Sequence, residues 1–494
     1  MMAALDPTDP RTATGNPVAT PVQVPANLAS RSLPLILSIY LFCVVVPIGF
    51  NVGPLLVTSL RGFLLVVTLP LWLGIFSGRY GRILVSDIFF VLHILWATLA
   101  LASNSPAQVL TQTGSTGIEF LGGYALGRAY IRSEAEYLVL CRALVRIACM
   151  LVPFAIYETI TGSPILIRLM KMVPGMVTVP PNNYPPRLHL SRVQVTFAHP
   201  IHFGLFYSVI FSQAFVALRK QVSNAKRYWL SAVIAATGFL SLSSGALLSI
   251  LLQFGFILWA FLIRSAKYRW WILLGCFVAA YIVIDLFSNR GPIRVFMSYA
   301  TFSSATAYYR ALIFDWGMQN VWASPILGIG MNDWFRPDYM HIASVDNFWL
   351  LTTMRYGIPG FMLLAIGFLW SIVRVMRLAL TDGSALGLIR RAWVFTFFGL
   401  TFTLTTVHIW SNIYSFVFFF FGAGMWMISG AAKTSAPGGP DPVAASASPA
   451  AAQSRVAGSL VAGGRVAGSR AAGTPYSRFA PRRRRGGPAA DAAD

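Results

Sequence analysis

The chain has 494 residues, of which 56% are hydrophobic and 11% are charged, with a formal net charge of +22. Soluble proteins are about 45–50% apolar and about 25% charged, so this composition excludes a soluble globular protein and predicts a membrane protein. Apolar runs of about 20 residues, long enough to cross a bilayer, recur from Leu33 to Ser429.

The positive charge is concentrated in two kinds of segment. The tail after Ala432 carries nine Lys or Arg residues and three Asp. Much of the remainder lies in short loops between apolar segments, where membrane orientation accounts for it. Nucleic-acid binding is therefore not expected. The 4 cysteines fall inside apolar segments without metal-like spacing, which predicts small core residues and no disulfide framework.

The N-terminal residues 1–32 are rich in Pro, Ala, Thr and Asn, and they lack a basic start and a cleavage site, so we expect a disordered cytoplasmic leader. Residues 33–430 predict an all-α polytopic membrane domain with about twelve transmembrane helices. The fourth span is the least typical, because it is rich in Gly and Thr. The predicted spans are 34–50, 54–76, 83–102, 112–131, 137–160, 200–218, 228–243, 246–263, 270–287, 347–373, 392–409 and 413–430.

The loop charges predict the orientation of these spans. With the N-terminus in the cytoplasm, the short outside loops near 51–53, 103–111 and 410–412 hold no Lys or Arg. Basic residues on the cytoplasmic side are typical of membrane proteins, so we expect both termini in the cytoplasm of a bacterial inner-membrane protein. The inside loops hold Arg79, Arg82, Arg128, Arg132, Arg219, Lys220, Lys226, Arg227, Arg264, Lys267, Arg269, Arg374, Arg377, Arg390 and Arg391.

Two outside segments, 161–199 and 288–346, are long and charged. The second is a large periplasmic loop between the ninth and tenth spans. Its stretch SATAYYRALIFDWGMQNVWAS has the spacing of an amphipathic helix, and the PILGIGMNDW that follows is rich in turn residues. We therefore expect a folded, partly helical cap.

The tail, 431–494, is expected to be disordered in the cytoplasm. Its arginine run either contacts anionic lipid or is solvated.

Arginines on the outside loops are the first candidates for chemistry. A guanidinium group is always charged, and its planar fork of donors matches phosphate oxygens. Several on one side of the membrane, where positive charge is normally depleted, favour an anionic head group such as a lipid diphosphate. Ordinary solvated charges or contacts with lipid phosphates are the alternative for each one taken alone.

Polar residues at the ends of two spans are further candidates. His199 precedes Pro200, and His202 lies one turn deeper; two histidines without a carboxylate are a weak metal signal, so no metal site is predicted. Asp346 and Asn347 precede the tenth span, where they suit helix capping, and a carboxylate facing arginines also suits a general base. Arg355 places a charge inside that span, beside a Gly-Pro break.

Several stretches, in one order across 34–430, now point to a family. They are FLGGYALGRAYIRS (120–133), RVQVTFAHPIHFG (192–204), LSLSSGALLS (240–249), YYRALIFDWGMQNVWASPILGIGMNDW (308–334) and DNFWLLTTMRYGIPG (346–360). Together with the topology, they resemble the O-antigen ligase and polymerase superfamily of bacterial surface polysaccharides. Motifs of other enzyme classes, such as GxxxxGK[ST], HExxH, GxSxG and Asp-x-Asp, are absent from the sequence.

The resemblance implies transfer of a glycan from undecaprenyl diphosphate to an acceptor hydroxyl during surface polysaccharide or exopolysaccharide synthesis, without a metal, nucleotide or other cofactor. It implies that outside arginines hold the diphosphate and stabilise its charge, while a base removes the acceptor proton. The catalytic candidates are Asp346, Arg310 and His199, with Asn347 as an orienting residue. The diphosphate-binding candidates are Arg187, Arg192, Arg290 and Arg310.

Two departures from the family pattern favour a polymerase-like or exopolysaccharide branch. Asp346 stands where many members carry a His before the Asn, and Arg355 stands where members often carry a Glu. The expected partners are the lipid-linked glycan, its acceptor, the bilayer, and a chain-length regulator or export complex.

A transporter or flippase of a sugar or lipid-linked glycan is the main alternative. It would explain the span count and the intramembrane Arg61, Arg142 and Arg355, but not the arginine-bearing outside loops or the lack of an internal repeat. A scaffold for envelope assembly is a third class, and no feature specifically favours it.

Overall fold

The computed structural model describes residues 32–429, apart from 53–54, 267, 290–291, 293–294, 296–303, 342 and 382. The predicted leader (except Ser32), the predicted tail and Arg290 therefore lie outside the described residues.

Each of the predicted spans contains helix. The helices are α1 (Leu35–Val45), α2 (Ser59–Phe76), α3 (Val85–Asn104), η2 (Pro106–Gln108), α4 (Val109–Gly117), the π-helical turn η3 (Ile118–Gly122), α5 (Gly123–Tyr130), α6 (Glu134–Thr161), α7 (Ile165–Lys171), α8 (Pro200–Phe215), η4 (Ala217–Lys220), α9 (Asn224–Phe239), α10 (Ser244–Leu262), α11 (Arg269–Phe287), α13 (Ser304–Ala323), α14 (Phe348–Met376), α15 (Ala385–Thr403), α16 (Ser411–Gly422) and η5 (Met425–Met427).

Among the described residues, 8 helices are long and apolar enough to cross a membrane: α2, α3, α6, α8 with η4, α10, α11, α14 and α15. This confirms an all-α polytopic membrane protein. By contrast, α1, α9 and α16 are short, and the segment from α4 to α5 is interrupted by a π-helical turn. The count of about twelve spans therefore stays a prediction. The helix expected in the large loop is present as α13, although its apolar residues do not gather on one face as the predicted amphipathic spacing implied.

A small sheet was not predicted. Strands β1 (Ile48–Val52), β2 (Leu55–Thr58) and β3 (Val177–Thr178) form an antiparallel sheet in the order β2-β1-β3. The first two helices are therefore shorter than predicted. The first ends at Val45 and not at residue 50, and the second begins at Ser59 and not at residue 54. Cross-strand hydrogen bonds satisfy the backbone of these apolar residues where the helices stop.

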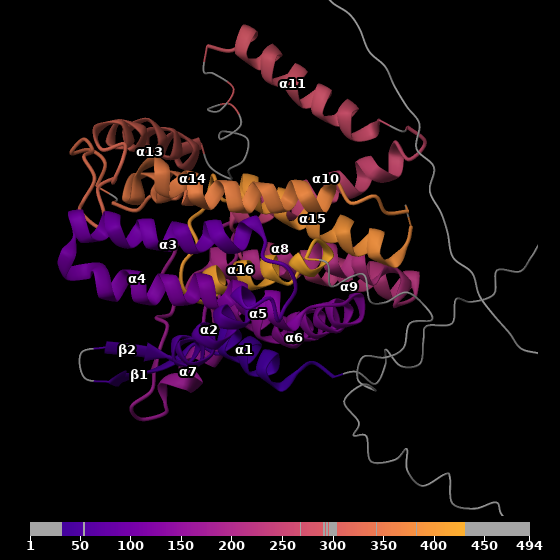
Figure 1. Ribbon diagram of the computed structural model, residues 1–494, viewed down its shortest axis with the longest axis horizontal. Helices are drawn as coiled ribbons and strands as arrows, with labels where there is room; N and C mark the ends of the chain where they lie inside the picture. Colours follow the sequence, from indigo (N-terminus) through magenta and orange to yellow (C-terminus); the bar gives the residue numbers. More distant parts are fainter. Residues whose placement is uncertain are drawn as a thin grey trace, which may run out of the picture. The chain divides into compact units, whose positions relative to one another are not determined.

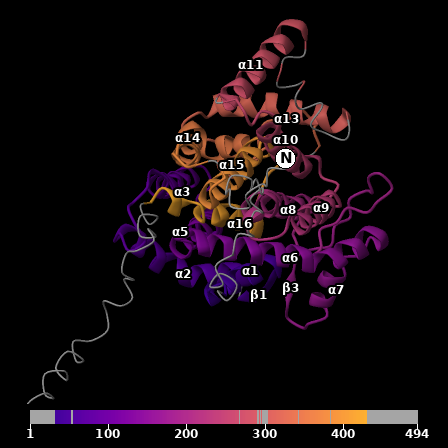
Figure 2. The same ribbon diagram turned by 90° about the vertical axis from the view of Figure 1, so that its right-hand side faces the viewer.

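The centre of the helix packing is formed by α8 and α16. In α8 with η4, 89% of the span is buried, and α16 contributes a run of fully buried phenylalanines from Phe418 to Phe421. In contrast, α11 has no buried residue, and it projects from the helix packing (Figures 1 and 2). It contacts α15 through the ring pairs Trp270–Phe395 and Phe277–Phe402, whose centres lie 5.7 Å and 6.2 Å apart.

The connections expected on the outside are joined to one another. In Figure 1, α13, the β1–β2 hairpin and the α3–α4 turn all lie at the left-hand ends of the helices. This grouping agrees with the predicted alternation of the spans. The hydrogen bonds that join these connections run from Ser191 N to Thr159 O, Val193 N to Leu240 O, Phe348 N to Leu404 O, Thr178 Oγ1 to Pro47 O and Asn332 Nδ2 to Asn104 O.

Two basic residues of the predicted inside loops, Arg128 and Arg227, are buried, and Arg128 has the more elaborate setting. Arg128 is buried, with 1% of its surface exposed. Its guanidinium donates to Tyr80 O (2.7 Å) and Arg82 O (2.8 Å), and its Nε lies 3.6 Å from Asp87 Oδ1. Tyr124 Oη donates to the same Asp87 oxygen at 2.5 Å. Arg128 therefore joins α3 and α5 through a buried ion pair, and removal of either charge would leave the other unpaired.

Candidate active site

The loop before α8 carries the first candidate arginines, and a buried carboxylate fixes its shape. Glu158, on the last turns of α6, accepts hydrogen bonds from Gln194 N (3.0 Å) and Val195 N (2.7 Å). Val195 has a φ of 55°, so the backbone turns sharply at this point. Asn182 Nδ2 donates to Arg192 O at 3.0 Å and ties the two ends of the loop together. Arg192 is thereby held on a rigid support.

The two arginines of this loop are buried to different degrees. Arg192 is 7% exposed, and its guanidinium carbon lies 5.0 Å from the centre of the Tyr184 ring. Arg187 is half-buried and donates from Nη1 to Leu242 O at 2.9 Å. Leu242 belongs to the small-residue hairpin between α9 and α10, so that hairpin holds an arginine in addition to packing helices.

A Gly-rich turn docks the cap helix α13 onto α14. The helical path of α14 is broken at Gly357, which has a φ of 71°. The break frees the carbonyls of Met354 and Arg355, which accept from Ile329 N (2.8 Å) and Gly330 N (3.1 Å). A side chain at Gly357 would lie 2.0 Å from Ile326 O, so only glycine fits. The PILGIG turn after α13 and the GIPG break in α14 therefore contact each other. Together they form the Gly-rich joint between the two helices.

This joint brings Arg310 of α13 next to the start of α14. Arg310, 9% exposed, lines a small cavity of about 10 Å³ together with Asp346 and Asn347. The Nε and Nη1 of Arg310 and the Nε of Arg192 are buried without a hydrogen-bond partner among the described residues. Buried donors of this kind are costly unless a partner satisfies them, so both guanidinium groups are open to an anion.

Asp346 and Asn347 have separate roles. Asn347 is the N-cap of α14, because its Oδ1 accepts from Leu350 N at 3.0 Å. Asp346 makes no hydrogen bond within the described part of the chain and is half-buried. The cap explains Asn347 and leaves the Asp346 carboxylate available.

The groups of this cluster influence one another electrostatically. Burial raises the pKa of the Asp346 carboxyl, and the charges of Arg310 and Arg192 partly oppose that rise. Burial lowers the pKa of Arg192 to about 10, with a further lowering from the charge of Arg187. Burial also lowers the pKa of Arg310. Arg310 and Arg192 face the Asp346 carboxylate and Arg187 lies near both arginines, which leaves a formal excess of positive charge in the cluster.

His199 lies beside the same arginines and caps α8. Ile201 N donates to its Nδ1 at 3.0 Å, and the Tyr184 ring centre lies 4.7 Å from its own. Burial, with the charges of Arg192 and Arg187, lowers the pKa of His199 to about 4, so the ring is neutral at neutral pH. Because Nδ1 accepts, the proton of the neutral ring is on Nε2, and this nitrogen is a donor.

A polar pocket of about 240 Å³ lies nearby, between α3, α4 and α14. It contains the ion pair Arg61–Glu119 (2.8 Å), with Glu119 on the π-helical turn. Such turns often occur at functional sites. The pocket wall combines charged, hydroxyl and aromatic groups. Its polar and aromatic lining includes Arg61, His93, Gln112, Thr113, Ser115, Thr116, Glu119, Phe348, Thr352, Arg355, Tyr356, His408, Trp410, Ser411 and Tyr414.

A band of rings connects this pocket with the arginine cluster. Trp410 packs against His202, with ring centres 3.9 Å apart, and against His199 and His408 at 5.8 Å and 5.7 Å. Nδ1 of His408 and Nε2 of His202 are buried without a hydrogen-bond partner among the described residues. Burial and the charge of Arg355 lower the pKa of His408 to about 3, so this ring is also neutral.

The candidate residues from the sequence divide into two groups. One group lies close enough together for its charges to act on one another. It comprises Arg187, Arg192, Arg310, His199 and Asp346, with Asn347 beside them. Arg290 lies outside the described residues. Within the described part of the chain, no three His, Cys, Asp or Glu side chains are placed to share a metal ion.

Sequence reasoning missed Glu158, Tyr184, His408 and Trp410. His408 and Trp410 adjoin the short outside loop near 410–412, and polar rings there are a signal that could have been used. Glu158 lies inside an apolar span, where burial of a carboxylate costs free energy. A carboxylate at such a position therefore indicates a functional or positioning role.

Replacement of Glu158 by glutamine is expected to lower activity by displacing Arg192. The amide keeps one acceptor oxygen but places N–H donors against a backbone N–H, which costs about 1–3 kcal/mol for an unsatisfied buried donor. Limited proteolysis of the 182–199 loop and the activity of the purified variant measure the effect. Glu134→Gln, at the other end of α6, is the control. An intact loop with normal activity in Glu158→Gln would refute the positioning role.

Comparison with known families agrees with the resemblance found in the sequence. A family model described as O-antigen ligase matches residues 229–365, which include α13, the Gly-rich joint, Asp346 and Asn347. This match supports assignment to the O-antigen ligase and polymerase superfamily, and with it a function of that type in surface glycan assembly. No curated protein matches the chain.

Proposed function

Because the match to the O-antigen ligases covers the segment that holds Arg310 and Asp346, we propose that this protein is a lipid-linked glycan transferase. It takes a glycan from undecaprenyl diphosphate and joins it to an acceptor hydroxyl on the periplasmic side of the inner membrane. Both termini lie in the cytoplasm.

One observation carries the proposal. The guanidinium groups of Arg192 and Arg310 are buried, have unsatisfied donors and share a single carboxylate neighbour, Asp346. With Arg187, the cluster has an excess positive charge that suits a diphosphate, and the planar donor forks suit its oxygens.

The proposed reaction is a direct displacement. The acceptor oxygen forms a bond with the anomeric carbon of the donor sugar, and the bond between that carbon and the diphosphate oxygen breaks. The diphosphate leaves with the bonding electron pair, and the arginines stabilise its growing negative charge. Asp346 takes the proton of the acceptor hydroxyl. His199, with its proton on Nε2, donates a hydrogen bond to a diphosphate oxygen.

The polar pocket is suited to the acceptor glycan. The Trp410, Tyr356 and Tyr414 rings supply flat apolar faces, and Arg355, Glu119 and Gln112 supply hydrogen-bonding groups. A binding site of this composition, mostly ring surface with a few polar groups, fixes the orientation of a ligand that is itself part apolar and part polar. The ring band through Trp410 joins it to the arginine cluster.

Glycan transfer by the purified protein in detergent tests the proposal, because transport has no meaning without two compartments. We expect the lipid-linked glycan to be consumed and a longer or newly joined glycan to form. If the donor stays intact in detergent but crosses the bilayer of proteoliposomes that contain the protein, the transporter alternative is correct.

A further inference from the structure

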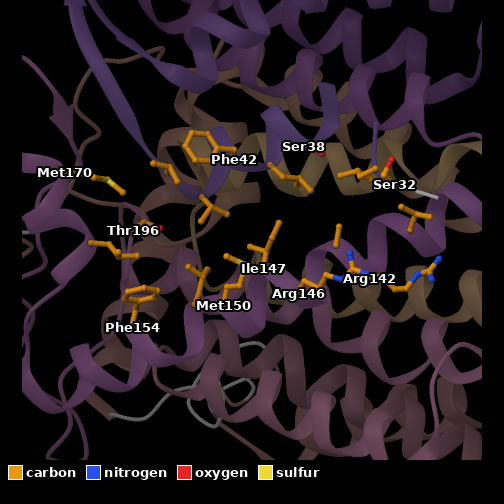
Figure 3. Close-up of a pocket in the computed structure, with 18 residues that line it drawn as sticks. Ser32, Ser38, Phe42, Arg142, Arg146, Ile147, Met150, Phe154, Met170 and Thr196 are labelled. Atoms are coloured by element: carbon orange, nitrogen blue, oxygen red, sulfur yellow. The ribbon is translucent and has the colours of Figure 1, made fainter. Parts of the chain in front are cut away.

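A groove of about 670 Å³ runs between α1 and α6, and at one end it reaches Thr196 of the active-site loop. Its wall is apolar over most of its length, and α7 closes one end (Figure 3). On one side α1 packs against α2 and α16, and on the other α6 packs against α8 and α9, so a gap remains between the two. The α6 face of the groove is a single helical stripe of Val139, Arg142, Ala143, Arg146, Ile147, Met150, Leu151 and Phe154.

Two arginines lie towards one end of this apolar groove. Arg142 is half-buried and Arg146 is exposed, and Figure 3 shows both near Ser32, with Met170 and Thr196 at the opposite end. Within the described residues, no hydrogen bond or ion pair holds Arg146. Arg142 also donates from Nε to Leu138 O at 3.4 Å, within its own helix. The two arginines are four residues apart on one face, so their like charges repel each other, and an anion between them would relieve that repulsion.

The arginines lie far from the active-site loop. From Glu158, which holds that loop, Arg146 and Arg142 are about 18 Å and about 24 Å along the axis of α6. The hydrocarbon core of a bilayer is about 30 Å thick, so both guanidinium groups come within about 12 Å of the opposite head-group layer. Long basic side chains extend towards that layer, which places them within reach of a lipid phosphate.

We infer that this groove is a binding site for an anionic phospholipid of the leaflet opposite the active site. Its phosphate lies between Arg142 and Arg146, and one acyl chain follows the apolar wall towards Phe154. From Arg142 to Phe154 the stripe is about 18 Å long, close to half the thickness of the hydrocarbon core. The apolar wall of the groove accommodates the acyl chain of the lipid. The paired arginines favour a lipid with a net negative charge.

Native mass spectrometry of the full-length protein in detergent tests this site. The probes are dioleoyl-phosphatidylglycerol and dioleoyl-phosphatidylcholine, which have the same chains. We expect the first bound lipid to be phosphatidylglycerol, preferred by roughly tenfold, because phosphatidylcholine has the same phosphate but its choline cation would be repelled by the two arginines. The double variant Arg142→Gln/Arg146→Gln should lose this preference, and Arg219→Gln, an exposed arginine away from the groove, should keep it.

A second variant tests the acyl-chain part of the site. Met150→Trp fills the groove and should weaken binding of both lipids without changing the charge. Equal binding of the two lipids by the wild type, or an unchanged preference in the double variant, would overturn the inference. So would displacement of the lipid by undecaprenyl phosphate with no effect of the arginine substitutions, because the groove would then hold the donor's chain.

Discussion

Replacing Arg310 by lysine is expected to lower the rate of glycan transfer by roughly ten- to a hundredfold. The arginine has two buried donors without a partner, Nε and Nη1, and the several oxygens of a diphosphate could accept from both edges of its guanidinium group. Lysine keeps the charge, but a single ammonium cannot reproduce the planar fork. Steady-state kinetics of the purified variant, with donor concentration varied, measure the loss.

Arg168→Lys is the matched control for this experiment. Arg168 lies on α7, is exposed, and follows the same α6 end that holds the active-site loop, but it is not part of the cluster. It should retain normal activity. If Arg310→Lys is as active as this control, Arg310 does not hold the leaving group bidentately.

Asp346→Asn is expected to lower the rate further, by roughly a hundredfold or more, with normal folding. The substitution keeps the size of the side chain and removes its basicity. Helix capping is not at issue, because Asn347 is the residue that caps α14. The rate of transfer and the elution profile of the variant measure chemistry and folding separately, and Asp338→Asn on the same loop is the control.

The pH dependence of the wild type follows from the same residue. A general base must be ionised, so the rate rises with pH as Asp346 loses its proton. Burial raises the pKa of Asp346, so the acidic limb should lie above about 3.9, the value of a free aspartate. The limb should be missing in the residual activity of Asp346→Asn. An active Asp346→Asn with an unchanged profile would move the base role to His341, which is exposed on the same loop.

The membrane architecture could be predicted because each span is a local pattern. Apolar runs define the helices, loop charges define their alternation, and turn residues such as those of PILGIG mark the breaks. The helix over residues 304–324 was predicted for the same reason, and α13 is present there without a distinct apolar face. Each of these features depends on residues close together in the chain.

The rest depended on contacts between distant segments. The role of Glu158 could not be predicted because its hydrogen-bond partners, Gln194 and Val195, are more than thirty residues away in the sequence. The β1–β3 pairing likewise joins Ile48 to Thr178. Arg128 was assigned to a loop by its charge, but it is buried against Asp87 because the end of α5 meets the start of α3. Sequence patterns identify the candidate residues, and the three-dimensional structure shows which of those residues contact one another.

Binding of a short-chain polyprenyl diphosphate, measured directly on purified wild type and variants, tests the arginine cluster most directly. Arg310→Lys and Arg192→Gln should each bind it roughly tenfold or more weakly, whereas Asp346→Asn should bind it at least as well as the wild type, because only the chemical step needs the base. The corresponding monophosphate should bind more weakly to the wild type and be less sensitive to the arginine substitutions. Equal affinity of the wild type and both arginine variants for the diphosphate would contradict the account.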